Sequence, residues 1–313
     1  MFDVAHVGIL VADVIAKTVD TIPGKGKLGL INSLDLRNGG CAMTAAVNMA
    51  TIGRSTAILG KIGKDGFGSY LKGVLQEAGV DTNGLIEDEK AATSASVALV
   101  DGGGERTFLH CRGANAEFTE EDIDYTVIGK ANIVFVAGTM LMPAFDGRPC
   151  ATFLQKARAM GKITTLDTAW DATGSWMKTL APCMPHIDYF LPSYEEAVCF
   201  AGGKEDPEDI AKCFFDMGVK TVVIKLGAEG CFLKEHKDAG GIRIPAYKVD
   251  AVDTTGAGDS FCSGFLTGLA MNLPLKDCCE LGMATGALCV TATGATTGMK
   301  PYAEILSFMA SRR

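Results

Sequence analysis

The chain has 313 residues, of which 48% are hydrophobic and 21% are charged, and its formal net charge is −8. This composition excludes a disordered chain, and a chain this long can bury a core without the disulfide bonds on which small secreted scaffolds depend. The negative charge argues against nucleic acid and anionic membranes as partners. An acidic chain can still bind phosphate through backbone amides, a metal ion or a single lysine.

Neither a membrane segment nor an export signal is predicted. No window of about 18 apolar residues escapes interruption, and the most apolar stretch, residues 133–145, contains Gly138 and Pro143. A signal peptide begins with a basic region, but Asp3 stands at that place near the N-terminus. Asp13 also interrupts the apolar run that would follow, so no signal peptide is predicted. The 11 cysteines form no C-x-x-C pair, which favours reduced thiols in a cytoplasmic protein.

Short apolar, β-branched runs alternate with stretches in which Ala, Leu, Met and Phe have helical spacing. We predict strands at residues 4–11, 56–59, 133–137, 163–166, 189–191 and 222–224. Continuous apolar strands interleaved with helices are typical of a mostly parallel sheet with helices on both faces. The sequence therefore predicts an α/β, doubly wound fold, in which ligands bind at the carboxyl ends of the strands.

Two segments, residues 14–37 and 92–112, interrupt this alternation. Each contains a strand-like stretch, at residues 27–32 and 94–100 respectively, together with glycine-rich turns. We predict that they form a small β-sheet inserted into a single α/β domain spanning residues 1–313. Such a sheet near the strand ends would act as a lid that excludes water from the chemistry. The alternative is a surface hairpin without a function.

A polar, glycine-rich turn at residues 254–258 runs directly into an apolar helical stretch at residues 261–273. Glycines allow the backbone to approach a ligand closely and to point successive amides in one direction. A helix that begins near Gly258 adds unpaired N–H groups and the positive end of its dipole at the same point. The segment therefore predicts an anion site built without basic side chains.

Asp259 lies beside this predicted anion site, where a bound phosphate would repel its carboxylate. One interpretation is a helix-terminus effect, since acidic residues are favoured in the first turn by a few tenths to about 1 kcal/mol. The other is a general base that takes a proton from a hydroxyl attacking the phosphate. The segment alone leaves both interpretations open.

Residues 253–259 read Asp-Thr-Thr-Gly-Ala-Gly-Asp and are followed by Phe261 and Gly264. Further segments precede them in the chain: Asp13 after the first strand, Gly39-Gly40 with the downstream Ala46, Ala50 and Gly53, residues 60–68, and residues 113–115. Together they resemble, in the same order, the signatures of the ribokinase-like (PfkB) family of sugar and nucleoside kinases. The resemblance covers essentially the whole chain.

The resemblance implies a ribokinase-like fold and an ATP-dependent kinase that transfers the γ-phosphoryl group to a hydroxyl of a small sugar. Asp259 would be the general base, and the amides of Gly256, Ala257 and Gly258 would be the anion hole for the developing charge. The residues implied to hold the sugar are Asp13, Gly39, Gly40, Thr44 and Asn115.

The resemblance also implies nucleotide contacts at Ser193, Lys225, Gly227, Gly230 and Thr254. Glu196, at the glutamate of the family's Asn-x-x-Glu motif, would order Mg²⁺ and its waters. Asp253 and Thr255 lie where many relatives bind K⁺. Two positions depart from the family pattern: Thr44 replaces an asparagine that contacts the substrate, and Ser193 replaces the asparagine of the magnesium motif.

Two other functions stay open at this stage. One is a nucleoside kinase of the same family, which would need an apolar or aromatic slot for a base beside the sugar. The other is a non-catalytic sugar- or nucleotide-binding protein on the same fold. Because exposed apolar strands often pair between subunits, we also expect a homodimer formed through the lid.

Overall fold

The apolar runs of the sequence assemble into a nine-stranded sheet in the computed structural model, which describes residues 1–312 apart from the side chain of Arg106. The strands are β1 (Phe2–Gly8), β2 (Val11–Lys17), β3 (Ser33–Gly39), β4 (Thr56–Gly63), β5 (Asp81–Asp88), β6 (Ala95–Val100), β7 (Arg106–Cys111), β8 (Ala131–Thr139), β9 (Ile163–Thr168), β10 (Tyr189–Phe190), β11 (Thr221–Lys225), β12 (Cys231–Lys234) and β13 (Ile242–Ile244). The α-helices are α1 (Cys41–Ile52), α2 (Gly66–Glu77), α3 (Tyr125–Gly129), α4 (Arg148–Ala159), α5 (Met177–Leu180), α6 (Tyr194–Phe200), α7 (Pro207–Asp216), α8 (Ala257–Ala270), α9 (Leu275–Val290) and α10 (Tyr302–Ser311). Short 3-10 helices occur at η1 (Gly113–Glu117), η2 (Glu120–Asp122), η3 (Met184–His186) and η4 (Gly227–Glu229).

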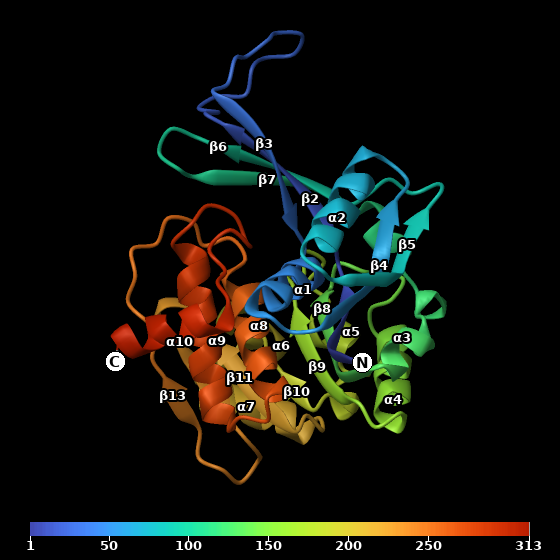
Figure 1. Cartoon of the computed structure of the whole chain (residues 1–313), viewed down its shortest axis with the longest axis vertical. Helices are drawn as coiled ribbons and strands as arrows, with labels where there is room; N and C mark the ends of the chain where they lie inside the picture. Colours follow the sequence, from blue (N-terminus) through green and yellow to red (C-terminus); the bar gives the residue numbers. More distant parts are fainter. Residues whose placement is uncertain (313) are drawn as a thin grey trace.

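The main sheet has the strand order β13-β12-β11-β10-β9-β8-β1-β4-β5 (Figure 1). From β11 to β5 in this order, neighbouring strands run parallel, and β12 and β13 extend one edge in antiparallel fashion. All residues of β4 and nearly all of β8 are buried. Burial on both faces explains the continuous apolar strands and confirms the predicted doubly wound sheet.

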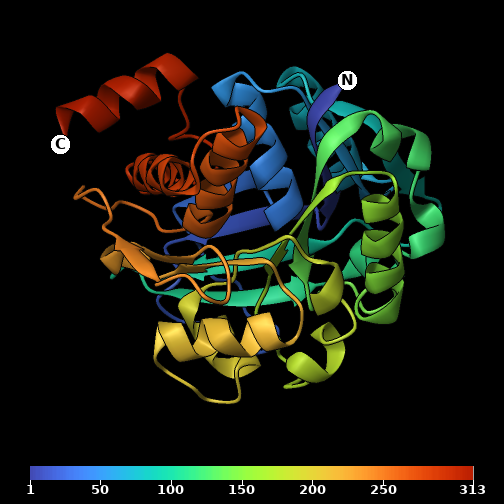
Figure 2. The same ribbon diagram turned by 90° about the horizontal axis from the view of Figure 1, so that it is seen from below.

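Helices cover both faces of this sheet and form two separate apolar cores. On one face α3, α4, α6 and α7 pack against the strands, and on the other face α1, α2, α8 and α9 do so. Figure 2 shows these two layers on opposite sides of the sheet. Within residues 1–312, no helix combines the length and the apolar character needed to cross a bilayer.

A second, four-stranded sheet with the order β3-β2-β6-β7 projects from the body where β1 ends (Figure 1). Its strands come from the two segments predicted to interrupt the fold, which confirms a small separate sheet. The predicted strand at residues 27–32 is wrong. That stretch is an exposed loop, with Leu28 and Leu30 88% and 90% exposed, and the strand that pairs with β2 is Ser33–Gly39 instead.

The chain first enters the small sheet at Leu10, after β1, leaves it after β3 into α1, enters it again before β6 and finally leaves it after β7. Asn115 in η1 joins the first and the last of these crossings, because its Nδ2 donates to the carbonyl oxygen of Leu10 at 2.9 Å and its Oδ1 accepts from the amide of Leu10 at 3.3 Å. Its side chain is almost completely buried. Asn115 therefore fastens the base of the small sheet to the body.

His6 in β1 is completely buried against Phe135, with their ring centroids 5.8 Å apart, and neither ring nitrogen has a hydrogen-bond partner among the described residues. Burial lowers the pKa of His6 from 6.5 to about 3. Below pH 6.5 the unfolded state binds a proton that the native state does not. The free energy of unfolding should therefore fall by about 1.4 kcal/mol per pH unit as the pH decreases through this range.

We expect His6→Leu to remove this contribution, so that its unfolding free energy decreases less between pH 6.5 and pH 4.5 than that of the wild type. Urea unfolding at several pH values measures the difference. His236→Leu, at an exposed histidine, is the matched control and should retain the wild-type pH dependence. An unchanged slope in His6→Leu would contradict the prediction.

Candidate active site

A cavity of about 1150 Å³ opens at the carboxyl ends of β9 and β11, against the first turn of α8. One end is lined by carboxylates and glycine amides. The other end is apolar, and Val249, Met283, Ala287 and Val290 line it. A cavity of this size, with one polar and one apolar end, suits a ligand that has both a charged and an aromatic part.

The first turn of α8 forms the polar wall of the cavity. Gly256 precedes the helix with φ +74°, and a Cβ at this position would lie 2.4 Å from the Cβ of Ala295, so only glycine fits. The first helical bond runs from the amide of Ser260 to the carbonyl oxygen of Gly256 at 2.8 Å. The amides of Gly258 and Asp259 precede that bond and point out of the helix end, where the dipole favours an anion.

The amide of Ala257, which is also predicted to donate to an anion, lies in the turn that leads into α8. It donates to the carbonyl oxygen of Thr254 at 3.2 Å and so closes that turn. Ala257 thus already has a backbone partner, and its contact with an anion stays a prediction.

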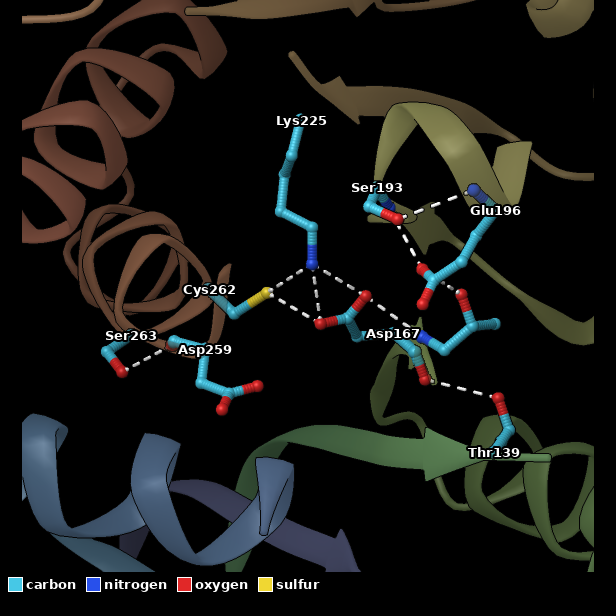
Figure 3. A network of polar contacts seen from close by, with 9 residues as sticks. Thr139, Asp167, Ser193, Glu196, Lys225, Asp259, Cys262 and Ser263 are labelled. Carbon is cyan, nitrogen blue, oxygen red and sulfur yellow. Dashed lines mark hydrogen bonds and ion pairs between the residues drawn. The ribbon is translucent and has the colours of Figure 1, made fainter. Parts of the chain in front are cut away.

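Asp259 lies in the first turn of α8 and lines the cavity. Loss of water around the carboxylate raises its pKa, while the positive charge of Lys225 and a hydrogen bond from the Cys41 thiol oppose that rise. In Figure 3 the carboxylate points away from the other side chains drawn. The charge of the Asp13 carboxylate also raises the pKa of Asp259, by less than burial does.

Asp167 and Lys225 form a buried ion pair beside Asp259 (Figure 3). The ammonium nitrogen of Lys225, at the end of β11, lies 2.8 Å and 2.7 Å from the two carboxylate oxygens of Asp167, in β9. The thiol of Cys262, one turn into α8, donates to Asp167 at 3.3 Å. The carboxyl ends of two strands and the start of one helix thus meet at this point.

Ser193 and Glu196 form a capping box at the start of α6. The amide of Glu196 donates to Ser193 Oγ at 3.4 Å, and Glu196 Oε2 accepts from the amide of Ser193 at 3.1 Å. The same Oε2 accepts from the hydroxyl of Thr168 at 2.9 Å. Both residues line the cavity, and this box gives Glu196 a local structural role in addition to any metal contact.

Asp13 lies in β2 of the small sheet, next to Gly39 in β3. A Cβ on Gly39 would lie 2.0 Å from Oδ2 of Asp13, so glycine leaves room for the carboxylate. Burial raises the pKa of Asp13 to about 6, and a hydrogen bond from Ser96 partly opposes the rise. Gly40 follows as the N-cap of α1, with φ +89°. The small sheet thus directs a carboxylate toward the first turn of α8.

The register of the small sheet continues this polar surface. Arg37, Asp13, Ser96 and His110 lie opposite one another on adjacent strands, so their side chains share one face. Ser96 Oγ lies 3.0 Å from Nδ1 of His110. The same face also carries Ile15, Ala98 and Phe108, and the opposite, outer face carries Leu34, Leu36, Val97 and Leu109. The polar row from Arg37 to His110 therefore has apolar neighbours on its own face.

The remaining predicted substrate and nucleotide residues differ in their surroundings. Thr44 in α1 is completely buried, and its hydroxyl has no hydrogen-bond partner among the described residues. Asn115 is engaged with Leu10, as described above, so its amide holds the base of the small sheet. Gly227, Gly230 and Thr254 line the cavity.

Asp253 is buried in the turn before α8. Its Oδ1 accepts from the amide of Thr255 at 2.8 Å, and its Oδ2 accepts from the amide of Gly294 at 2.9 Å. The carbonyl oxygen of Thr255 accepts from the Cys289 thiol at 3.4 Å. No cluster of three or more His, Cys, Asp or Glu side chains suited to a metal ion occurs in the described part of the chain.

Sequence reasoning did not assign five residues that the structure brings to this region: Cys41, Ser96, His110, Asp167 and Cys262. The signal for Asp167 was present, because it directly follows a predicted strand. To predict Ser96 and His110 at this region, one would need to know that β2 pairs in parallel with β6, which no local pattern specifies.

Comparison with known proteins places the chain among carbohydrate kinases. A family model described as pfkB family carbohydrate kinase matches residues 1–301. The chain is 27% identical over 315 residues to fructokinase-2 of Zea mays, with 93% of this chain and 91% of that protein aligned.

Solved structures show the same fold. Arabidopsis thaliana ribokinase complexed with ribose and ATP is 22% identical, with a TM-score of 0.87 over 98% of both chains. An Escherichia coli chain solved in complex with ATP and Mg²⁺ is 20% identical, with a TM-score of 0.84 over 99% of this chain and 100% of that chain. At these identities, the likenesses establish the fold alone.

Gly39→Ala should displace the Asp13 carboxylate, because the new Cβ would occupy the space of Oδ2. A carboxylate moved toward water should lose the effect of burial, so the pKa of Asp13 should fall from about 6 toward its ordinary value. NMR titration of labelled aspartate carboxyls measures this pKa. In the control, Gly73→Ala in α2, the Cβ meets no atom within 4 Å, and the pKa of Asp13 should be unchanged. An unaltered titration in Gly39→Ala would refute the close approach.

Proposed function

Because the chain belongs to the pfkB family of carbohydrate kinases and is an ATP-dependent sugar kinase, we propose that it phosphorylates a hydroxyl of fructose or a closely related small sugar. The observation that carries the proposal is the position of Asp259, a carboxylate in the first turn of α8 that lines the cavity beside unpaired amides. This arrangement combines a proton acceptor and an anion site at one point.

In the proposed reaction, Asp259 accepts the proton of the sugar hydroxyl as the hydroxyl oxygen attacks the γ-phosphorus of ATP. The bond between that phosphorus and the bridging oxygen breaks, and its electron pair remains on ADP. The amides around Gly256 and Gly258 stabilise the negative charge on the phosphoryl group. The positive end of the α8 dipole acts in the same direction.

The nucleotide would extend from this point along the cavity. Its phosphates would lie near Gly227, Gly230 and Thr254, and its base at the apolar end, beside Met283 and Val290. Ser193 lines the same wall and would contact the phosphates. The cavity volume of about 1150 Å³ exceeds what a nucleotide requires, which leaves space for a second substrate.

Glu196 fits a role in holding Mg²⁺, because it is a carboxylate in the cavity wall, held in place by hydrogen bonds to Oε2 from the Thr168 hydroxyl and the Ser193 amide. Magnesium binds through one or two protein carboxylates, phosphate oxygens and water, and it would neutralise phosphate charge. Asp253 and the carbonyl of Thr255 offer the hard oxygen ligands that K⁺ requires. We assign K⁺ to this turn and Mg²⁺ to Glu196.

The sugar would lie between the small sheet and α8. Asp13 would accept hydrogen bonds from sugar hydroxyls, with Gly39 and Gly40 allowing close approach, and Thr44 offers a hydroxyl without a protein partner. The segments 14–37 and 92–112 would act as a lid that closes over the sugar and excludes water. Asn115 would position this lid through Leu10.

A second copy of the chain is the partner that we propose for the outer face of the lid. Leu34 and Leu109, on that face, are 66% and 63% exposed, and exposed apolar strands tend to find a partner. The 11 cysteines are all free within the described residues, which supports the proposed cytoplasmic location.

Asp259→Asn should lower kcat by about 100-fold or more, because a general base is removed while shape and volume are kept. ATP binding, measured by calorimetry, and the melting temperature should stay near wild-type values. Asp277→Asn, an exposed acidic residue in the first turn of α9, is the matched control and should retain wild-type turnover. More than about a tenth of wild-type kcat in Asp259→Asn would exclude the assigned role.

ADP release with fructose, ribose and adenosine as acceptors should identify the substrate class. We expect fructose to give the highest kcat/KM, with adenosine at least about 100-fold lower, because the row of Asp13, Ser96 and His110 offers hydrogen bonds to sugar hydroxyls. Preference for adenosine would indicate a nucleoside kinase. No turnover with any acceptor would favour a non-catalytic binding protein.

A further inference from the structure

The ammonium group of Lys225 lies at the N-terminus of α8 (Figure 3). Its side chain is 11% exposed, and its nitrogen lies 2.7 Å from Asp167 and 3.8 Å from the sulfur of Cys262. A Cβ built on Gly258 would lie 3.4 Å from the same nitrogen. The cation therefore borders the glycine turn in which the amides point toward the cavity.

Carboxylates surround this cation. Burial raises the pKa of Asp167 and of Asp259, and the charge of Lys225 opposes both shifts. Burial alone would lower the pKa of Lys225, but Asp167, Cys262 and Glu196 raise it above its ordinary value. Lys225 is thus charged throughout the working pH range, in a region that is otherwise acidic.

The other basic side chains that line the cavity lie at its exposed rim. Arg243 is 57% exposed and pairs with Glu229 at 3.7 Å, and Lys248 is also exposed. Of the basic residues described in the cavity wall, Lys225 is the one buried beside α8. A polyphosphate brings several negative charges to this acidic region. One fixed cation at the helix end would therefore strongly reduce the repulsion between the region and the polyphosphate.

A structural role explains the pair of Lys225 and Asp167 less well than a functional role does. A buried ion pair contributes little net stability, because removing two charges from water costs about as much as their attraction returns. Lys234, which is buried, pairs with Glu208, whose side chain is 34% exposed, with 2.7 Å between Nζ and Oε1, next to Val222 at the start of β11 and away from the cavity. That pair lies at the opposite end of the strand and provides an internal comparison.

We propose that Lys225 is a catalytic residue whose ammonium group contacts the phosphoryl group during transfer, and that Asp167 is the positioning residue that directs it toward the start of α8. This proposal rests on the proposed kinase function. A bond forms between the sugar oxygen and the γ-phosphorus, the bond to the bridging oxygen breaks, and its electron pair stays on ADP. The sugar proton passes to Asp259. Lys225 forms no covalent bond and keeps its proton, and it stabilises charge that the amides neutralise only in part.

The test compares Lys225→Met, Lys225→Arg and Asp167→Asn with Lys234→Met as the matched control, using the full chain. We expect Lys225→Met to lower kcat about 100-fold or more while the Kd for AMP, which has no phosphoryl group to transfer, stays within about twofold of wild type. Lys225→Arg should restore part of the lost kcat. Asp167→Asn should lower kcat with little change in the sugar KM. Lys234→Met should lower the melting temperature and leave kcat near wild type.

A kcat in Lys225→Met within about threefold of the wild type would overturn the proposal. An equal loss of kcat in Lys234→Met would also overturn it, because a general loss of stability would then explain both results. If Lys225→Met does not fold, wild-type kcat in Asp167→Asn overturns it. Asp259→Asn is assayed in parallel: retained turnover there rejects the general base, whereas the Lys225 variants report on the phosphoryl contact itself.

Discussion

Negative charge is concentrated in this protein around the cavity that we propose for a polyphosphate. Asp167, Glu196 and Asp259 come from three different elements and line this cavity, and the charge of Asp13, outside the lining, also raises the pKa of Asp259. Their mutual repulsion, and that of a phosphate, is offset by the unpaired amides and the dipole at the start of α8 and by the charge of Lys225. The parallel sheet brings Asp167, Lys225 and Asp259 together, because strand ends and helix starts share one edge.

Much of this arrangement could be predicted from the sequence. The turn at residues 254–258 is local: glycines, a helix start and a carboxylate are adjacent in the chain, so their geometry follows from short-range rules. The apolar runs also predicted the doubly wound sheet, because strands buried on both faces lose the alternation that marks half-exposed strands. Features that neighbouring residues encode could therefore be predicted from the sequence.

Features that depend on contacts between distant segments could not be predicted from the sequence. Residues 27–32 have a strand-like pattern, but a strand also needs a neighbour, and β2 pairs with residues 33–39 instead. The pair between Asp167 and Lys225 joins positions 58 residues apart, and the row from Asp13 to His110 requires the register of the small sheet. The bond from the Ala257 amide to the carbonyl oxygen of Thr254 likewise depends on the shape of the turn, which the residue types alone do not specify.

The connections between the small sheet and the body limit how that sheet can move. The chain crosses between them at four places, after β1, after β3, before β6 and after β7, and two hydrogen bonds between Leu10 and Asn115 link the first crossing to the last. Asp13, Ser96 and His110 lie on β2, β6 and β7, which pair with one another in one continuous sheet. A displacement of that sheet relative to the body would therefore carry the three side chains together, so that none of them could leave a bound sugar alone.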